Sequence, residues 1–512
     1  MKKRLSKKQM ILFSVGQFGW SLLGGIISAW LVTFFMPTGP EVGYGAIQYI
    51  VPGLVIGGFM TVLGLITALS RVFDAVTDPL IASLSDRSTN KRGRRIPFMQ
   101  VAAIPFSIVT VLLFCIDFGA YNSNLGWLNI VWVSVMLVLF YTFMTMYCTP
   151  YNALISEFGQ EQEDRMFIST AISFTYLFGT LFAYVPFVLA GVNSKLVEDE
   201  LGGTHYEHTP NFVTGLLRNT GMDESSAFAW SFRICFIVLA VIACVAMLLP
   251  AFGLKETDFI DPKPSNENVF KSLVATFKNK DFRVFSLSDI MYWVGLTMFQ
   301  TGLPFFVKVS MGFDPGLVIV FMGGMSVLAA VFYPFVTKFV NKWGKKKLVI
   351  AGFLGLAICY TIAAISSIPG VCPETGNANI VSWIFGVVIM LVSALPMALL
   401  GIIPQSIVAD VAEAEAKTTG QNREGMFFAA RTFAMKFGQS LAMILFTSLA
   451  VSMAAATTAT EVVPTKAGMI IVAIAAVVFC VLGAVILMFY REKHIMGIIS
   501  KDKKEDAHEE SK

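Results

Sequence analysis

Three charged side chains share one face of a strongly apolar segment. Arg71, Asp74 and Asp78 occupy positions i, i+3 and i+7 in the stretch SRVFDAVTDP, directly after the apolar run FMTVLGLITAL. On an α-helix this spacing places the two carboxylates one turn, or ~6 Å, apart on the same side. A charge in a membrane interior costs from ~2.5 to more than 10 kcal/mol, so this face must look into protein or water.

The surplus acid in this segment predicts a cation site. Arg71 can neutralise one carboxylate, and the second then needs a proton or a metal ion. Pro79 removes a backbone hydrogen bond, which leaves the carbonyl of Ala75 as a further oxygen for a hard cation. We therefore expect Asp74 and Asp78 to bind Na⁺ or H⁺ and expect no cofactor besides this ion. The alternative is a structural network in which the three charges only satisfy one another.

A lysine lies deep in another apolar segment, REGMFFAARTFAMKFGQSLAMILF. Lys436 is about eleven residues into that span, roughly 16 Å by helical rise, which is deep for snorkelling to the surface. It should meet an anion inside the protein. If two halves of the chain pack face to face, Asp74 and Asp78 are its natural partners. A structural pair with another acid is the alternative.

The composition is that of a membrane protein with many spans. Only 14% of the 512 residues are charged, 55% are hydrophobic, and the mean hydropathy is +0.69, far more apolar than a soluble protein. Apolar runs of about 20 residues are continuous rather than alternating, which predicts helices and excludes a barrel. We expect an all-α fold with twelve spans, at 9–36, 57–85, 97–118, 127–156, 167–192, 228–252, 284–308, 314–340, 348–368, 380–408, 425–453 and 467–491.

Basic residues orient these spans. The segments MKKRLSKK, DRSTNKRGRR and NKWGKKK, and the linker with Lys271, Lys278, Lys280 and Arg283, all fall on one side, whereas PTGPEVGYG and CPETGNAN carry no lysine or arginine. Because cytoplasmic loops are enriched in these residues, both termini are predicted to be cytoplasmic. The same bias explains the net charge of +4 without nucleic-acid binding.

A basic turn recurs at equivalent places in two halves of six spans. GRR at 93–95 follows the second span and GKK at 344–346 follows the eighth, and each glycine lets the chain turn tightly. Two such halves are what a rocking transporter needs. The expected division is a cytoplasmic N-tail (1–8), an N-terminal six-helix bundle (9–253), a cytoplasmic linker (254–283), a C-terminal six-helix bundle (284–491) and a charged cytoplasmic tail (492–512).

Other chemistries find little support. No span contains a histidine or a convincing catalytic set, so an enzyme is not expected. The motif HYEH offers His205 and His208 to a metal, but spacing supplies no third ligand, and a solvated loop is favoured. The seven cysteines imply no disulfide framework. The first apolar segment is too long for a signal peptide and is expected to be retained.

Three stretches, RVFDAVTDPLIASLSDRSTNKRGRRIPF, YCTPYNALISEF and ADVAEAEAKTTGQNREGMFFAARTFAMKFGQ, resemble the glycoside-pentoside-hexuronide:cation symporter family of the major facilitator superfamily. The resemblance implies that Asp74 and Asp78 form the cation site, as metal ligands if the ion is Na⁺, that Thr145 adds an oxygen, and that Arg71 and Lys436 complete the charged network. It implies a major facilitator fold.

The chain departs from the melibiose-permease-like pattern where those members contact sugar. Acids, a tryptophan and an arginine are replaced here by Ser21, Cys148, Asn152 and Thr170, so the resemblance does not carry over a galactoside. Hydrogen-bonding groups around aromatic rings are the usual sugar ligands. Candidates for substrate contact, each with packing as its alternative, are Gln17, Trp20, Tyr151, Asn152, Tyr292, Trp293 and Gln300.

The expected function is symport of a small molecule, a sugar or glycoside, with Na⁺ or H⁺ by alternating access. We expect a monomer surrounded by membrane lipid, in the plasma (bacterial inner) membrane. One alternative is a cation-coupled transporter of a lipid-like amphiphile, since distant relatives move lysophospholipids. The other is a transport-dead membrane sensor with the same fold.

Overall fold

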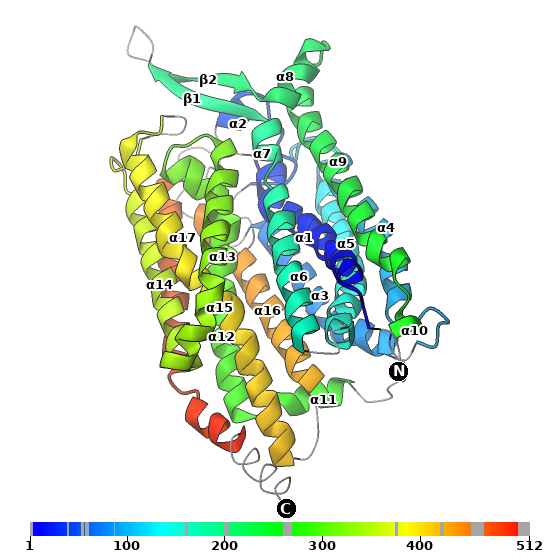
Figure 1. Ribbon diagram of the computed structural model, residues 1–512. Coiled ribbons are helices and arrows are strands. Elements are labelled where there is room, and N and C mark those ends of the chain that lie inside the picture. The colour runs from blue at the N-terminus through cyan, green and yellow to red at the C-terminus, as the bar shows by residue number, and fades with distance from the viewer. Residues whose placement is uncertain are drawn as a thin grey trace, which may run out of the picture.

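The computed structural model (Figure 1) describes residues 4–37, 40–52, 56, 61–86, 88–158, 162–198, 204–259, 269–373, 377–419, 424–451 and 465–499. The predictions for residues 1–3 of the N-tail, for DPKPSNEN in the linker and for residues 500–512 of the C-terminal tail lie outside the described residues.

Twelve long helices form the body of the described protein, which confirms the predicted helical membrane fold. Eleven of them are long and apolar enough to cross a membrane. The remaining one, α3, is less apolar because every 18-residue stretch of it contains Arg71, Asp74 and Asp78. The bounds are α1 (Lys7–Phe35), α3 (Val62–Asp86), α4 (Ile96–Cys115), α5 (Trp127–Phe158), α6 (Gln162–Phe182), α9 (Glu224–Gly253), α12 (Lys280–Phe305), α13 (Val318–Trp343), α14 (Lys345–Ser366), α15 (Ile380–Thr419), α16 (Glu424–Val451) and α17 (Lys466–Leu487).

Two helices depart from their predicted spans. The expected span 167–192 is interrupted: α6 ends at Phe182, and a short α7 (Pro186–Leu189) begins at a proline, which cannot continue the hydrogen bonds of a helix. The expected span 380–408 is too short, because α15 runs on to Thr419. Its last turns read ADVAEAEAK, and alanine, glutamate and lysine favour helix without needing to be buried.

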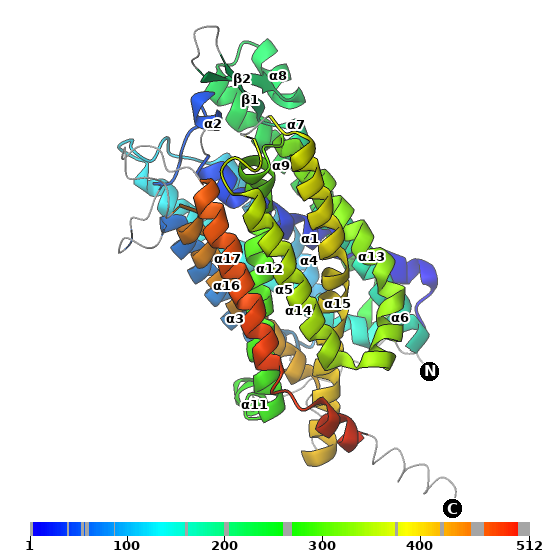
Figure 2. The same cartoon turned by 90° about the vertical axis from the view of Figure 1, so that its left-hand side faces the viewer.

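The two halves repeat the same helix pairs. α1 packs along α6 and α9 as α12 packs along α16 and α17, and α4 packs on α5 as α14 packs on α15. Between the halves, α3 and α16 pack along each other (Figure 2), whereas α6 and α13 make few contacts. The closest seam between the halves is therefore formed by the helix with three charges and the helix that carries Lys436.

The predicted basic turns have the same construction in both halves. Gly93 and Gly344 adopt positive φ angles of 117° and 81°, a conformation that favours glycine. Glu256 accepts two backbone N–H bonds, at 2.8 and 3.2 Å, at the start of α4. Glu492 accepts two, at 2.7 and 3.2 Å, at the start of α14. In each half, a glutamate just after the sixth helix thus caps the third helix, where the helix dipole favours negative charge.

A loop was expected between α6 and α9. The structure instead has a β-hairpin followed by a short helix. Strands β1 (Val192–Glu198) and β2 (Thr204–Pro210) pair antiparallel, and α8 (Phe212–Asn219) follows, at the end of the molecule opposite the termini (Figure 1). His205 and His208 are three residues apart on β2, so their side chains point to opposite faces. His208 pairs with Ser194 Oγ at 2.8 Å, and no group of three metal-ligating side chains occurs among the described residues.

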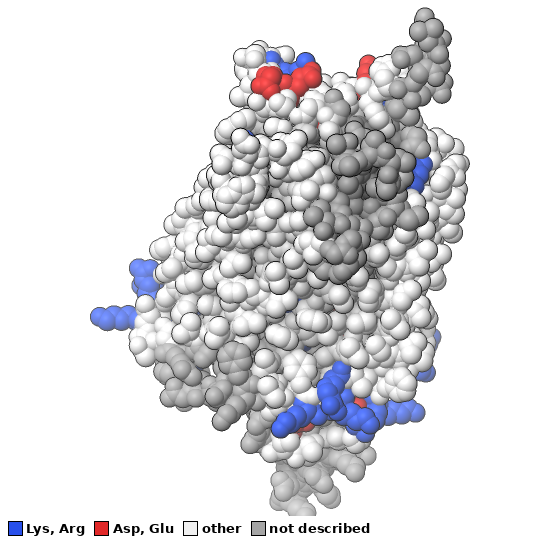
Figure 3. Space-filling model, turned by 180° about the vertical axis from the view of Figure 1, so that it is seen from behind, with Lys and Arg blue, Asp and Glu red and all other residues white. Residues whose placement is uncertain are grey.

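The surface matches a membrane environment. On the face in Figure 3, charged side chains gather near the two ends, and the broad middle carries almost none. Large apolar side chains point outward from many helices, including Val101 on α4 and Val245 on α9, which are 60% and 53% exposed. In water such a surface would be costly, whereas hydrocarbon accommodates it.

Replacing Glu256 with alanine should destabilise the fold. The side chain is fully buried, and its loss leaves two backbone N–H groups of α4 without partners, at about 1–3 kcal/mol each. The expected result is a lower melting temperature of the purified protein in detergent. Glu256→Gln keeps an acceptor oxygen and should lose less. Equal melting temperatures for Glu256→Ala and the unsubstituted chain would contradict the capping role.

Candidate functional site

A buried cluster of charge lies on the seam between α3 and α16. Lys436 Nζ is 2.7 Å from Asp74 Oδ1 and 2.7 Å from Asp78 Oδ2. Thr145 Oγ1, from α5, donates to Asp74 Oδ1 at 2.5 Å, and Thr149 Oγ1 donates to Asp78 Oδ1 at 3.1 Å. Asp74 is fully buried and Lys436 is 5% exposed. The expected contact of Lys436 with both aspartates is therefore present, and ion binding by this cluster stays a prediction.

Arg71 completes the cluster from the same helix as the acids. Its Nη1 is 3.8 Å from Asp74 Oδ2, and its guanidinium lies over the ring of Tyr141, 4.4 Å from the centroid. Asp74 Oδ2 accepts no hydrogen bond from any described residue. Arg71 therefore balances charge near Asp74 without filling the coordination of that oxygen.

The surplus of acid that the spacing in α3 predicts does not extend to the cluster as a whole. Two acids, Asp74 and Asp78, meet two bases, Arg71 and Lys436, so the cluster is neutral. The second base is Lys436, the partner that was expected if the two halves pack face to face. A cation that binds here must compete with the ammonium of Lys436. Carboxylate and hydroxyl oxygens are the ligands a hard cation takes, and Asp74, Asp78 and Thr145 offer them.

The predicted substrate residues of the first half have different surroundings. Gln17 is buried, and Trp20 has a buried Nε1 that donates to no described residue. Tyr151 stacks on Phe13, 4.4 Å between ring centroids, and its hydroxyl donates to the Phe13 carbonyl at 3.0 Å. The packing alternative thus describes Tyr151, which fastens α5 to α1. Asn152, the next residue, is exposed.

The predicted residues of the second half lie on α12. The rings of Tyr292 and Trp293 are 5.3 Å apart, and Tyr292 also contacts Phe353, 6.2 Å away. Trp293 Nε1 is buried and donates to no described residue, and Gln300 is partly buried. The rings of Tyr292 and Trp293 therefore lie together, whereas the ring that pairs with Trp20 among the described residues belongs to Tyr176.

Sequence reasoning missed several polar residues near these positions. Tyr176 of α6 lies beside Trp20, 6.3 Å between ring centroids. Asp289 of α12 and Arg431 of α16 form a bidentate ion pair at 3.0 and 3.2 Å. Both charges fall inside apolar spans, which is the signal that identified Lys436 and should have identified them as well.

A second ion pair joins the two halves near the hairpin end. Glu41 belongs to the short helix α2 (Pro40–Gly43), and Lys308 belongs to a π-helical turn (Phe306–Ser310) that follows α12. Lys308 Nζ donates to Glu41 Oε1 at 2.5 Å, and each residue is 9% exposed. Sequence reasoning missed this pair, although Lys308 ends a predicted span.

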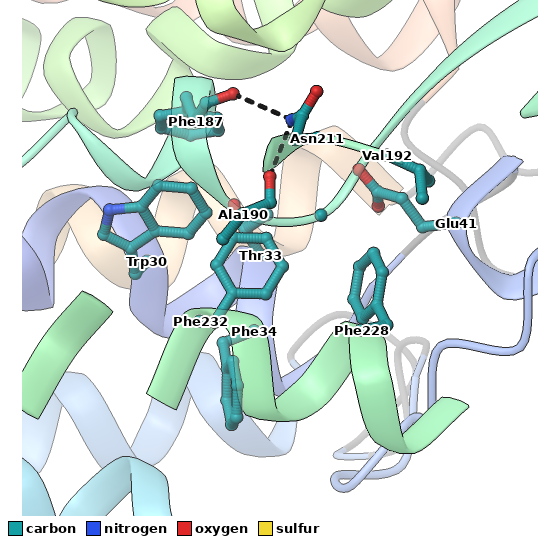
Figure 4. Close-up of a pocket in the computed structure, with 11 residues that line it drawn as sticks. Trp30, Thr33, Phe34, Glu41, Phe187, Ala190, Val192, Asn211, Phe228 and Phe232 are labelled. Atoms are coloured by element: carbon teal, nitrogen blue, oxygen red, sulfur yellow. Dashed lines mark hydrogen bonds between the residues drawn. The ribbon is translucent and has the colours of Figure 1, made fainter. Parts of the chain in front are cut away.

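The Glu41 side chain lies at a recess between α1, α7 and α9 (Figure 4). Five of the eleven lining residues are aromatic, and Asn211 closes one side by donating to the carbonyl of Ala190 at 2.7 Å. A second recess contains both Glu41 and Lys308. The lining of the first is Trp30, Thr33, Phe34, Glu41, Phe187, Ala190, Gly191, Val192, Asn211, Phe228 and Phe232.

Comparisons with known proteins agree with this architecture. A family model described as MFS/sugar transport protein matches residues 13–492. The chain is 26% identical to an uncharacterized symporter, YjmB, of Bacillus subtilis over 69% of this chain and 66% of that protein. It is 22% identical to sodium-dependent lysophosphatidylcholine symporter 1 of Xenopus tropicalis, over 60% and 61% of the two chains. It is 23% identical to the lactose permease of Leuconostoc lactis, over 69% and 50%.

The matched segments thus span between half and two thirds of these relatives' own lengths. A solved structure of a D-xylose-proton symporter shares the fold, with a TM-score of 0.60 and 14% identity, covering 94% of this chain and 97% of that one.

Replacing Lys436 with methionine should make the protein depend on a cation. Removing one partner of a buried ion pair costs roughly 3–5 kcal/mol, because Asp74 and Asp78 keep their charge without the ammonium. We expect a lower melting temperature in choline buffer and a larger rise on adding Na⁺ than the unsubstituted chain shows. Lys338→Met, at an exposed position of α13, is the control. Equal responses to Na⁺ in both variants would contradict the site.

Proposed function

Because the chain belongs to the MFS/sugar transport protein family of membrane transporters, we propose that it carries a sugar or glycoside together with Na⁺ or H⁺ by secondary active transport. The observation that supports this proposal most is the buried cluster on the seam, where Asp74 and Asp78 of one half meet Lys436 of the other. A charge cluster in that position responds both to an ion and to movement of the halves.

Coupling follows from competition for the two carboxylates. A cation that reaches Asp74 and Asp78 takes the place of the Lys436 ammonium and frees that group from α3. A buried ammonium without a partner is costly. It regains hydrogen bonds when a substrate with acceptor oxygens enters beside it. Ion and substrate therefore favour each other's binding, as symport requires.

The side that carries the termini is proposed to face the cytoplasm, because the basic turns at Gly93 and Gly344 lie on that side. The membrane is proposed to be the plasma membrane, the bacterial inner membrane in a bacterium. We propose that the monomer is the working unit and that lipid covers its apolar surface.

A sugar is the preferred substrate because buried hydrogen-bond donors occur among aromatic rings, as at Trp20 and Trp293. The similarity to a lactose permease is consistent with this choice. A lipid-like amphiphile is the second candidate, favoured by the similarity to a sodium-dependent lysophosphatidylcholine symporter. Uptake of lactose-like glycosides and of lysophosphatidylcholine into the same proteoliposomes separates the two.

Replacing Asp74 with asparagine should abolish ion-driven accumulation. The side chain keeps its size and loses the charge that a cation needs. The measurement is uptake of a panel of labelled glycosides into proteoliposomes, driven first by a Na⁺ gradient and then by a H⁺ gradient, which also identifies the ion. Asp314→Asn, at an exposed position, should transport normally. Full accumulation by the Asp74 variant would rule out this ion site.

Alternating access requires the Glu41–Lys308 pair to break when the hairpin side opens. Glu41→Gln should therefore let that side open more often. With a Thr33→Cys reporter, which lies at both recesses, in a chain whose native cysteines are replaced, labelling by a membrane-impermeant maleimide should become several-fold faster. Glu224→Gln, in the more exposed pair with Arg218, should not change it. Unchanged labelling in Glu41→Gln would argue against this closure.

A further inference from the structure

An ion pair separate from the cation cluster joins α12 to α16. Arg431 Nε is 3.0 Å from Asp289 Oδ2, and Arg431 Nη2 is 3.2 Å from Asp289 Oδ1. The Asp289 side chain is 2% exposed and that of Arg431 is 12% exposed. Two parallel hydrogen bonds fix the plane and the direction of the guanidinium.

The guanidinium keeps donors that the protein does not use. Arginine has five N–H groups, and Arg431 Nη1 makes no hydrogen bond to any described residue. Trp293 lies four residues after Asp289 on α12. Its Nε1 is buried and also makes no hydrogen bond to any described residue. An indole N–H can only donate. The unused groups here are therefore donors, and they fit a ligand that supplies acceptor oxygens.

Both halves of the chain approach this place. α12, which carries Asp289 and Trp293, contacts α1 of the other half. Trp20 of α1 lies beside Tyr176 of α6, and its Nε1 is another buried donor without a partner among the described residues. A ligand between Trp20 and Arg431 would thus touch the two bodies that must move relative to each other.

α16 links the Asp289–Arg431 pair to the buried charge cluster around Lys436. Arg431 and Lys436 are five residues apart on α16, about 7 Å along the axis. Lys436 points to α3 and Arg431 to α12. A rotation or shift of α16 that follows release of Lys436 therefore moves Arg431 as well.

On the basis of the proposed function, we propose that Arg431 is a specificity-determining residue that donates from Nη1 to an oxygen of the substrate, with Asp289 as its positioning residue. The ligand class is a neutral glycoside. Asp289 already balances the guanidinium, so a carboxylate added here would leave excess negative charge in a buried place. A hydroxyl or ring oxygen accepts the same hydrogen bond without adding charge.

The test compares matched neutral and acidic sugars. Dissociation constants of methyl glucoside, methyl galactoside and methyl xyloside, and of methyl glucuronide and methyl galacturonide, are measured by calorimetry on the purified full chain with Na⁺. The variants are Asp289→Asn and Arg431→Gln. The control is Asp281→Asn, because Asp281 forms an equally bidentate pair with Arg491, at 3.0 and 2.7 Å, near the start of α12. Melting temperatures confirm that each variant is folded.

The unsubstituted chain should prefer a glycoside over its uronide. Asp289→Asn leaves Arg431 with an unbalanced charge, so the preference should swing toward the uronide by about tenfold or more, and Arg431→Gln should weaken glycoside binding by about tenfold. Asp281→Asn should change neither. A purely structural pair would lower both affinities equally and leave their ratio unchanged.

Two outcomes separate this inference from the function on which it rests. In the first outcome, the unsubstituted chain accumulates a glycoside, but Asp289→Asn leaves the ratio of glycoside to uronide affinity unchanged, or the unsubstituted chain prefers uronides. The role of Arg431 is then overturned, and the proposed transport function is not. If no sugar binds and lysophosphatidylcholine is taken up, the proposed sugar transport is overturned, and the role of Arg431 falls with it.

Discussion

Two carboxylates buried inside a membrane protein must obtain positive charge from somewhere, and the fold supplies it across the seam between its halves. Lys436 reaches Asp74 and Asp78 only because α3 and α16 lie close together. Small and polar residues make that approach possible: Ser440 Oγ of α16 donates to the carbonyl of Ala68 on α3 at 2.8 Å, and Gly64 has no room for a side chain beside Thr447. Helix packing in membranes commonly relies on such contacts. The ionic cluster and the close packing of the seam thus depend on each other.

The repeat determines how the rest of the protein supports this seam. Each half builds the same helix pairs and closes the same turn with a glycine and a glutamate, so each can behave as one body. The seams between the bodies differ. α3 and α16 hold the charges, whereas α6 and α13 make few contacts and carry Tyr176 and Tyr333. An ion bound between α3 and α16 and a substrate bound beside Arg431, as proposed above, would act on the same two bodies.

The sequence predicted features that depend on one segment at a time. Continuous apolar runs located the helices, and the depth of Lys436 in its span predicted an internal anion. Features that depend on two segments were harder to predict. The bond between Lys436 and Asp74 spans 362 positions, and it could be expected only on the assumption that the two halves pack face to face. Glu41 looked like a loop residue because its partner, Lys308, comes from the other half. The hairpin between α6 and α9 was missed because polar strands outside the membrane lack the apolar signal that marks a span.

At two levels of the interface between the halves, the acid comes from the first half of the chain and the lysine from the second: Asp74 and Asp78 with Lys436 on α3 and α16, and Glu41 with Lys308 near the hairpin. The halves therefore face each other with opposite polarity, and their attraction depends on the local dielectric constant. Water that enters at one depth screens the attraction there by several-fold and leaves it nearly unchanged in the dry region at the other depth. The molecule can therefore come apart at one end while it stays fastened at the other.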